Sequence, residues 1–207
     1  MSKIKILIDN GHGISTPGKR APKPIEGVQL LEYKYAREIA SEVVKSLKMQ
    51  GYDAVLLVPE AADISLGQRC ARANAWCDTK GTKNVCLVSI HLNAAGNGAD
   101  WAKGRGWEAW TSPGQTLGDR LAESLYDAAQ KHLPTGTPIR TDMTDGDRDK
   151  EARFQILTGT RCAACLTENL FMDNLEDAKY LLSDAGRKAI TDLHVDGIVR
   201  YIKSLEK

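Results

Sequence analysis

The stretch VCLVSIHLN, residues 85–93, indicates the fold class of this chain most clearly. Its nearly continuous apolar run, rich in β-branched residues, is typical of a strand that is buried on both faces of a sheet. His91 stands near the carboxyl end of this run. Ligands of open α/β sheets bind in the crevice outside the carboxyl ends of the strands, so we interpret His91 as a candidate functional residue.

Two further apolar runs also end at polar side chains. Residues 4–8 (IKILI) lead into DNGHG, where two glycines allow the backbone to turn tightly around His12. Residues 162–167 are followed at once by Glu168. If the three strands are parallel neighbours, we expect His12, His91 and Glu168 to converge at one edge of the sheet.

The remaining sequence alternates between helical and strand patterns. Helices are expected over residues 28–50, 64–78, 117–132, 175–182 and 189–205, and further strands over residues 53–58 and 104–110. This alternation predicts an α/β fold, and no linker or repeat divides the chain, so residues 1–207 are interpreted as a single domain. The proline-containing residues 14–27 and the charged residues 134–153 are expected to be loops beside a cleft.

Glu32 lies near the start of the helix expected over residues 28–50. This position has an ordinary explanation, because the helix macrodipole favours acidic residues in a first turn. Two histidines and one carboxylate, however, form a set of three ligands that suits Zn²⁺ and leaves a coordination position open. We therefore interpret His12, Glu32 and His91 as ligands of a zinc ion, one per chain.

Composition and charge exclude several classes of protein. Lysine and arginine (28) nearly balance aspartate and glutamate (27), so the chain has no basic field for nucleic acid. The sequence has no apolar run long enough to span a membrane and no signal-peptide pattern at its start, so we expect synthesis in the cytoplasm. The five cysteines fit reduced thiols, because Cys162 and Cys165 are three residues apart in an expected strand and would point to opposite faces.

Three other residues have two interpretations each. Asn93 follows His91 by two residues, and it either contacts substrate or orients a ligand, or it is a turn residue. Trp107 and Trp110 in GWEAW either stack on a sugar or pack against the sheet, and packing is the more frequent role.

The order of the motifs resembles that of a known family. The chain contains ILIDNGHG, a helix led by Glu32, LGQRCARAN, VSIHLNAAG, GWEAW and CLTENLFMDNLEDAKYL. These resemble, over nearly the whole chain, the motifs of the zinc-dependent N-acetylmuramoyl-L-alanine amidases of the Amidase_3 type. The resemblance implies a twisted, mostly parallel sheet of about six strands flanked by helices on both faces. It also implies that His12, Glu32 and His91 are zinc ligands and that Glu168 takes part in catalysis. We recognise no separate cell-wall-binding domain in residues 1–207.

The reaction that the resemblance implies is hydrolysis of the amide between N-acetylmuramic acid and L-alanine in peptidoglycan. Zinc would activate water and polarise the carbonyl, while Glu168 moves a proton to the leaving amine. Because this substrate lies outside the cytoplasm, we expect a phage or prophage lysin, or a wall-remodelling enzyme, that is released or exported by another protein. A zinc exopeptidase acting on wall peptides and a non-catalytic peptidoglycan-binding or regulatory module are the alternatives.

Overall fold

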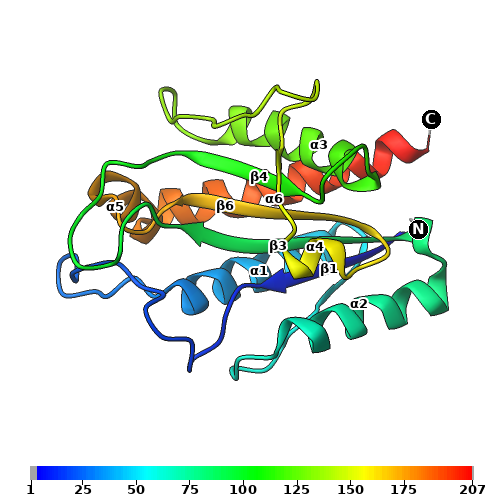
Figure 1. Cartoon of the computed structure of the whole chain (residues 1–207), viewed down its shortest axis with the longest axis horizontal. Helices are drawn as coiled ribbons and strands as arrows, with labels where there is room; N and C mark the ends of the chain where they lie inside the picture. The colour runs from blue at the N-terminus through cyan, green and yellow to red at the C-terminus, as the bar shows by residue number, and fades with distance from the viewer. Residues whose placement is uncertain (1–3, 207) are drawn as a thin grey trace.

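A single sheet forms the centre of the molecule (Figure 1). The computed structural model describes residues 4–206, and the order of the strands across the sheet is β2-β1-β3-β6-β4-β5. The strands are β1 (Lys5–Asn10), β2 (Asp53–Leu56), β3 (Val85–Asn93), β4 (Trp107–Thr111), β5 (Lys150–Glu151) and β6 (Ala163–Phe171).

Most neighbouring strands run in the same direction. Strands β2, β1, β3 and β6 are parallel, whereas β4 pairs with β6 in the antiparallel sense and β5 is parallel to β4. The expected mostly parallel sheet of about six strands is therefore confirmed. His12 follows β1, His91 lies in β3 and Glu168 lies in β6, and these three strands are consecutive parallel neighbours, which is the condition on which the expected convergence of the residues depended.

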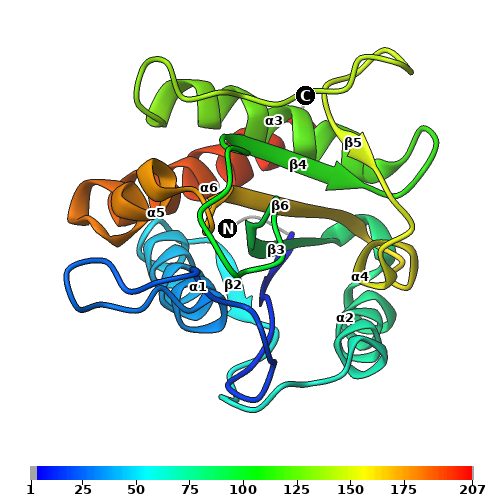
Figure 2. The same cartoon turned by 60° about the vertical axis from the view of Figure 1, so that its left-hand side comes forward.

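Helices cover both faces of this sheet (Figure 2). Helices α1, α3, α5 and α6 lie on one side, and α2 and α4 lie on the other. The helices are α1 (Glu32–Met49), α2 (Leu66–Lys80), the 3₁₀ helix η1 (Thr82–Asn84), α3 (Leu117–His132), α4 (Gln155–Thr158), α5 (Leu175–Leu182) and α6 (Asp184–Leu205).

Alternation along the strands produces two apolar cores. On β1, Ile6 and Ile8 belong to the core beneath α1, α3 and α6, whereas Leu7 belongs to the core beneath α2 and α4. On β3, Leu87 shares the second core, and His91 follows it on the same face by period two. The polar residues near the carboxyl end of β3 thus lie on the face of the sheet that α2 and α4 cover.

The structure corrects several expected boundaries. Helix α1 begins at Glu32 and not at residue 28, and α6 begins at Asp184, where the hydroxyl of Ser183 accepts a hydrogen bond from the Gly186 amide. The charged segment 134–153 contains the short strand β5, and α4 follows it, although neither was expected. Both elements are too short to leave a periodic pattern in the sequence.

Two other expectations can be checked against the described residues. All five cysteines are buried and free, and Cys162 and Cys165 belong to different cores, as predicted for structural thiols. Within residues 4–206, every helix is too short or too polar to cross a lipid bilayer.

Candidate metal centre and active site

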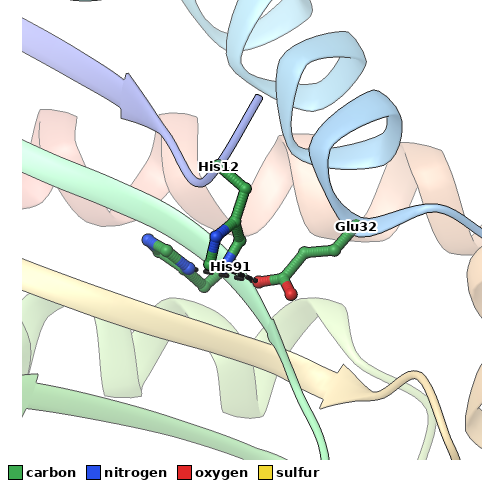
Figure 3. Close-up of side chains that lie close together, drawn as sticks. All are labelled: His12, Glu32 and His91. Carbon is green, nitrogen blue, oxygen red and sulfur yellow. Dashed lines mark hydrogen bonds and ion pairs between the residues drawn. The ribbon is translucent and has the colours of Figure 1, made fainter. Parts of the chain in front are cut away.

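Three side chains meet where β1, β3 and α1 come together (Figure 3). His12 follows β1, His91 lies in β3, and Glu32 is the first residue of α1. The ring centroids of the two histidines are 5.0 Å apart, and the rings are nearly perpendicular at 83°. Glu32 Oε1 lies 3.1 Å from His91 Nδ1 and 3.3 Å from His12 Nε2. One potential ligand atom from each residue falls within 4.8 Å of the others, so these residues could together hold a metal ion.

The glycines on either side of His12 allow its ring to approach His91 and Glu32. His12 adopts a φ of 62°, in the left-handed region, which turns the chain sharply after β1. A Cβ atom at Gly11 would stand 2.4 Å from Cε1 of His91, and one at Gly13 would stand 2.3 Å from the backbone nitrogen of Asp63. Glycine is therefore needed on both sides of His12, because a side chain at Gly11 would collide with His91 of β3 and a side chain at Gly13 would collide with the backbone at Asp63.

Arg69 of α2 stabilises the turn at His12 through hydrogen bonds. Its guanidinium Nη1 donates to Asp9 Oδ1 at 2.6 Å and to the Asn10 carbonyl at 2.7 Å, and its Nη2 donates to the His12 carbonyl at 3.2 Å. The second carboxylate oxygen of Asp9 accepts a hydrogen bond of 2.6 Å from the hydroxyl of Ser89. Arg69 and Asp9 are both buried, so this charge pair fixes the backbone that carries His12.

Glu32 is a buried carboxylate that remains ionised. Burial alone would raise its pKa, but hydrogen bonds from His12 and His91 outweigh burial and hold the pKa well below its usual range. Burial lowers the pKa of His91, and the contact with Glu32 reverses this and raises it. Glu32 Oε1 also accepts from the Leu92 amide at 3.1 Å, whereas Oε2 has no hydrogen-bond partner among the described residues. This free oxygen faces no competing donor and suits a metal ligand.

Glu168 lies on the neighbouring strand, β6, in register with His91. Its Oε2 is buried and has no hydrogen-bond partner among residues 4–206. Burial raises the pKa of Glu168 to about 8, and the charges of Glu32 and Glu108 add to the increase, although His91 opposes it. A carboxyl group with these properties can exchange a proton near neutral pH.

A second glutamate, Glu108, is paired with Glu168 across the sheet. Glu108 of β4 is in register with Glu168 and is buried. Its Oε1 accepts from Asn93 Nδ2 at 2.8 Å and from Trp110 Nε1 at 3.1 Å. Its Oε2 accepts from Arg140 Nε at 2.6 Å and from Lys150 Nζ at 2.8 Å. His91, Glu168 and Glu108 thus occupy adjacent positions on β3, β6 and β4.

Asn93 therefore has partners within the protein. Besides the bond to Glu108, its side-chain oxygen accepts from the Ala94 amide at 2.8 Å, which is the geometry of a turn residue. The contact with substrate stays a prediction. Trp107 is fully buried and its indole donates to Asn169, so it belongs to the core, whereas Trp110 is only partly buried and packs beside Phe154 at 5.4 Å between ring centroids.

The two remaining histidines lie apart from this centre. His132 at the end of α3 contacts Asp196, with 3.0 Å between Nε2 and Oδ2. His194 is buried in α6, where its ring contacts the Ile190 carbonyl and the hydroxyl of Thr167. Among the described residues, His12, Glu32 and His91 form the only group of three or more potential ligands.

The charged residues that support the site were not identified from the sequence. Arg69 was noted only as part of the LGQRCARAN motif, and Glu108, Arg140 and Lys150 were given no role. A signal was present for Arg69, because an arginine at an otherwise apolar helical position must find a buried partner. No comparable pattern marks Arg140 and Lys150, whose shared partner lies on another strand.

Comparisons with known proteins agree with this geometry. The model of the Amidase_3 family, described as N-acetylmuramoyl-L-alanine amidase, matches residues 6–200. The chain is 30% identical over 202 residues to the N-acetylmuramoyl-L-alanine amidase CwlM of Bacillus licheniformis, which covers 95% of this chain and 68% of that protein. It is 27% identical over 216 residues to the endolysin of Bacillus phage SPP1, covering 100% of this chain and 69% of the endolysin.

A solved structure has the same fold over almost its whole length. The N-acetylmuramoyl-L-alanine amidase AmiC2 of Nostoc punctiforme superposes with a TM-score of 0.72 at 27% identity, covering 97% of this chain and 98% of that one. The family match extends over more than half of the sequence and includes His12, Glu32, His91 and Glu168. The chain belongs to the Amidase_3 family of N-acetylmuramoyl-L-alanine amidases.

Proposed function

We propose that the protein is a zinc-dependent amidase that cleaves the bond between N-acetylmuramic acid and L-alanine in peptidoglycan. The observation that carries this proposal is the meeting of His12, Glu32 and His91 beside an unpartnered carboxyl group, that of Glu168. Membership of the amidase family supplies the substrate class. The ligand set supplies the reason to choose zinc.

The donor atoms fit Zn²⁺ in number and kind. Two imidazole nitrogens and one carboxylate oxygen form a typical set for catalytic zinc, which uses three protein ligands and keeps a fourth position open. Glu32 Oε2 has no hydrogen-bond partner among the described residues, and one donor atom of each side chain lies within 4.8 Å of the others, so a single ion could contact all three side chains. We assign one zinc ion per chain to His12, Glu32 and His91.

The protein groups around this site divide the work of amide hydrolysis. Zinc, when bound, supplies Lewis acidity that activates water and polarises the scissile carbonyl. Glu168 accepts the proton of the attacking water and passes it to the leaving amine, because its Oε2 has no partner among the described residues and the residue is paired with His91 across the sheet. Arg69 keeps His12 in place, since it bonds the carbonyl of that residue. Asn93 is proposed to orient Glu108 and to contact substrate at the same edge.

The location of the substrate follows from the family. Relatives of this chain are amidases and endolysins, and we propose that this protein also acts on the cell wall. Residues 1–207 are proposed to be one catalytic domain, given that the family match and the sheet both extend across it. Release or export by another protein stays a prediction for its route to the wall.

Analysis of the products tests the proposal directly. Purified peptidoglycan should yield peptides with a new free L-alanine amino terminus and intact glycan strands, measured by mass spectrometry. The reason is that a zinc site with one glutamate suits an amide, whereas glycosidases typically use two carboxylates that flank the sugar bond. The matched control is Glu168→Gln, which keeps the shape of the side chain and should lose about a hundredfold or more in turnover while retaining zinc.

Other products would contradict the proposal. New reducing sugar ends would identify a glycosidase, and cleavage between amino acids of the peptide would identify a peptidase. Binding of peptidoglycan without any hydrolysis would identify a binding or regulatory module. Full activity of the Glu168→Gln variant would place the proton-transfer group elsewhere.

A further inference from the structure

Charge is distributed unequally on the two sides of Glu168. On one side, β3 carries His91 of the proposed metal centre, and on the other side, β4 carries Glu108 in the same register. Glu108, Arg140 and Lys150 are here called the Glu108 cluster. Two cations contact a single carboxylate in this cluster, so it has a surplus of one positive charge.

The hydrogen bonds of the cluster leave donors unused. Glu108 is fully engaged, because its two oxygens accept four hydrogen bonds in all. Arg140 donates to this carboxylate only through Nε, and its two Nη groups donate to none of residues 4–206. Lys150 likewise makes a single side-chain hydrogen bond within that range. An ammonium and a guanidinium fork can donate more bonds than these.

These unused donors are held in place and remain accessible. The guanidinium of Arg140 lies 5.3 Å from the ring centroid of Phe171, and Nζ of Lys150 lies 5.3 Å from that of Trp110. The exposed fraction of the side chain is 41% for Arg140 and 19% for Lys150, against 3% for Glu108. The buried carboxylate of Glu108 therefore holds two cationic side chains that are partly exposed to solvent.

The opposite side of the centre has a different character. A cavity of about 470 Å³ adjoins His12 and His91, and it is lined by Asp9, Asp63 and apolar residues of α2 and α4. The one cation in its lining, Arg69, is buried and already donates to Asp9 and to two backbone carbonyls. Apart from the proposed zinc ion, this cavity has no unpaired positive charge, and it carries the carboxylates of Asp9 and Asp63, so beyond the metal it suits a neutral group such as a saccharide better than an acid.

We propose that Arg140 and Lys150 form a carboxylate-binding subsite for the peptide part of the substrate. This inference rests on the proposed amidase function, and it goes further by orienting the substrate: the acidic peptide lies over β4 and β5, and the saccharide lies towards α2. Paired cationic donors recognise a carboxylate through charge-assisted hydrogen bonds, and guanidinium binds it with two parallel bonds. Both residues determine specificity, and neither takes part in bond cleavage.

Binding of two small peptides tests the subsite. The probes are L-alanyl-D-glutamate and its diamide, which lack the muramyl amide and are not turned over by an amidase of this type. Calorimetric titration of the zinc-loaded protein should show about tenfold tighter binding of the dicarboxylate, the difference made by roughly one charge-assisted hydrogen bond.

Three variants separate recognition from a merely structural role. Lys150→Gln retains a donor for Glu108 but removes the surplus charge, and Arg140→Lys retains the charge but lacks the guanidinium fork. A fall of the affinity ratio in at least one of these variants supports the subsite and identifies the residue responsible. Lys203→Gln on the exposed end of α6 is the matched control for net charge and should keep the wild-type ratio.

Two results would overturn the inference: equal affinity of the wild type for both peptides, or an unchanged ratio in both Lys150→Gln and Arg140→Lys. If the cations serve only to neutralise Glu108, the substitutions will lower the melting temperature and leave the ratio intact. Hydrolysis of N-acetylmuramyl-L-alanyl-D-glutamate is measured separately. Its absence would contradict the amidase function, whereas the affinity ratio is read without turnover, so the two failures are distinguishable.

Discussion

At the scale of single residues, the same side chain has opposite roles in different surroundings. His12 and His91 stand at strand ends, with their rings directed at a carboxylate. His194 is a buried residue of α6 whose ring contacts Thr167 and the Ile190 carbonyl and no carboxylate among the described residues, and burial lowers its pKa from 6.5 to about 4. The structure thus contains two histidines that contact a carboxylate and one buried histidine whose neutral form is favoured by burial.

His194 should make the folded state sensitive to acid. Its folded-state pKa is below its unfolded value, so the unfolded chain takes up a proton first as the pH falls. The contribution to stability is present above pH 6.5 and is lost between pH 6.5 and about 4, by up to roughly 3 kcal/mol. The variant His194→Gln should lose less free energy of unfolding over this interval, measured by urea denaturation at several pH values.

The same substitution at His132 is the control for this experiment. The His132 ring is partly exposed beside Asp196, so His132→Gln should retain the acid-dependent loss that His194 causes. Equal slopes for wild type and His194→Gln between pH 6.5 and 4 would show that this buried imidazole does not govern the acid response.

The sequence marked candidate site residues by changes of its pattern. His12, His91 and Glu168 follow apolar runs, although Glu168 lies inside β6 in the structure, and Glu32 lies near the start of an expected helix. The partners of buried charges were not marked in this way. Arg69 is 60 residues from Asp9, and Lys150 is 42 residues from Glu108, so only the folded chain brings them together.

At the scale of elements, long periodic segments were predictable and short ones were not. Helix α3 (Leu117–His132) matches its expected range, because a helix of several turns repeats its apolar positions often enough to be seen. Strand β5 has two residues and α4 has four, and both depend on neighbours for their conformation. The position of β4 beyond β6 was also hidden, since strand order depends on packing between distant segments.

The packing of α6 on α3 gives a prediction at this scale. A Cβ atom at Gly197 of α6 would stand 2.7 Å from Cδ2 and 2.9 Å from Cα of Leu125 on α3. We expect Gly197→Ala to lower the free energy of unfolding by about 1–3 kcal/mol, because the clash exceeds the roughly 1 kcal/mol gained from helix propensity. The midpoint of urea denaturation measures the change.

Gly67 of α2 provides the matched substitution. A Cβ atom there would meet only Gln155 Nε2, at 3.9 Å, so Gly67→Ala should be neutral or stabilising by at most about 1 kcal/mol. If both alanine variants were stabilised equally, close approach between α3 and α6 at Gly197 would not be a constraint.

At the scale of the whole molecule, the proposed metal centre joins segments that are otherwise separate. His12 belongs to the turn after β1, Glu32 to the first turn of α1, and His91 to β3. Helix α1 lies on one face of the sheet, whereas the row of Ser89 and His91 lies on the other. A single ion bound by these three residues would therefore link helix α1, strand β3 and the turn after β1.

This arrangement predicts that zinc binding and global stability are linked. Purified protein should contain about one zinc per chain, because one open-sided set of three ligands is proposed. An ion that binds only the folded state stabilises it by about 4 kcal/mol when its free concentration is a thousand times the dissociation constant. Chelation should therefore lower the melting temperature and abolish activity, and added zinc should restore both.

Substitution of the proposed ligands tests whether His12 and His91 bind the zinc ion that stabilises the fold. His12→Ala and His91→Ala should fold at low temperature, contain little zinc, and melt at the same temperature with or without chelator. His132→Ala, whose ring contacts Asp196 far from the centre, should retain zinc and the full response to chelation. Metal analysis that finds no zinc or two tightly bound ions would contradict the single site, and zinc retained by both His12→Ala and His91→Ala would move it to other ligands.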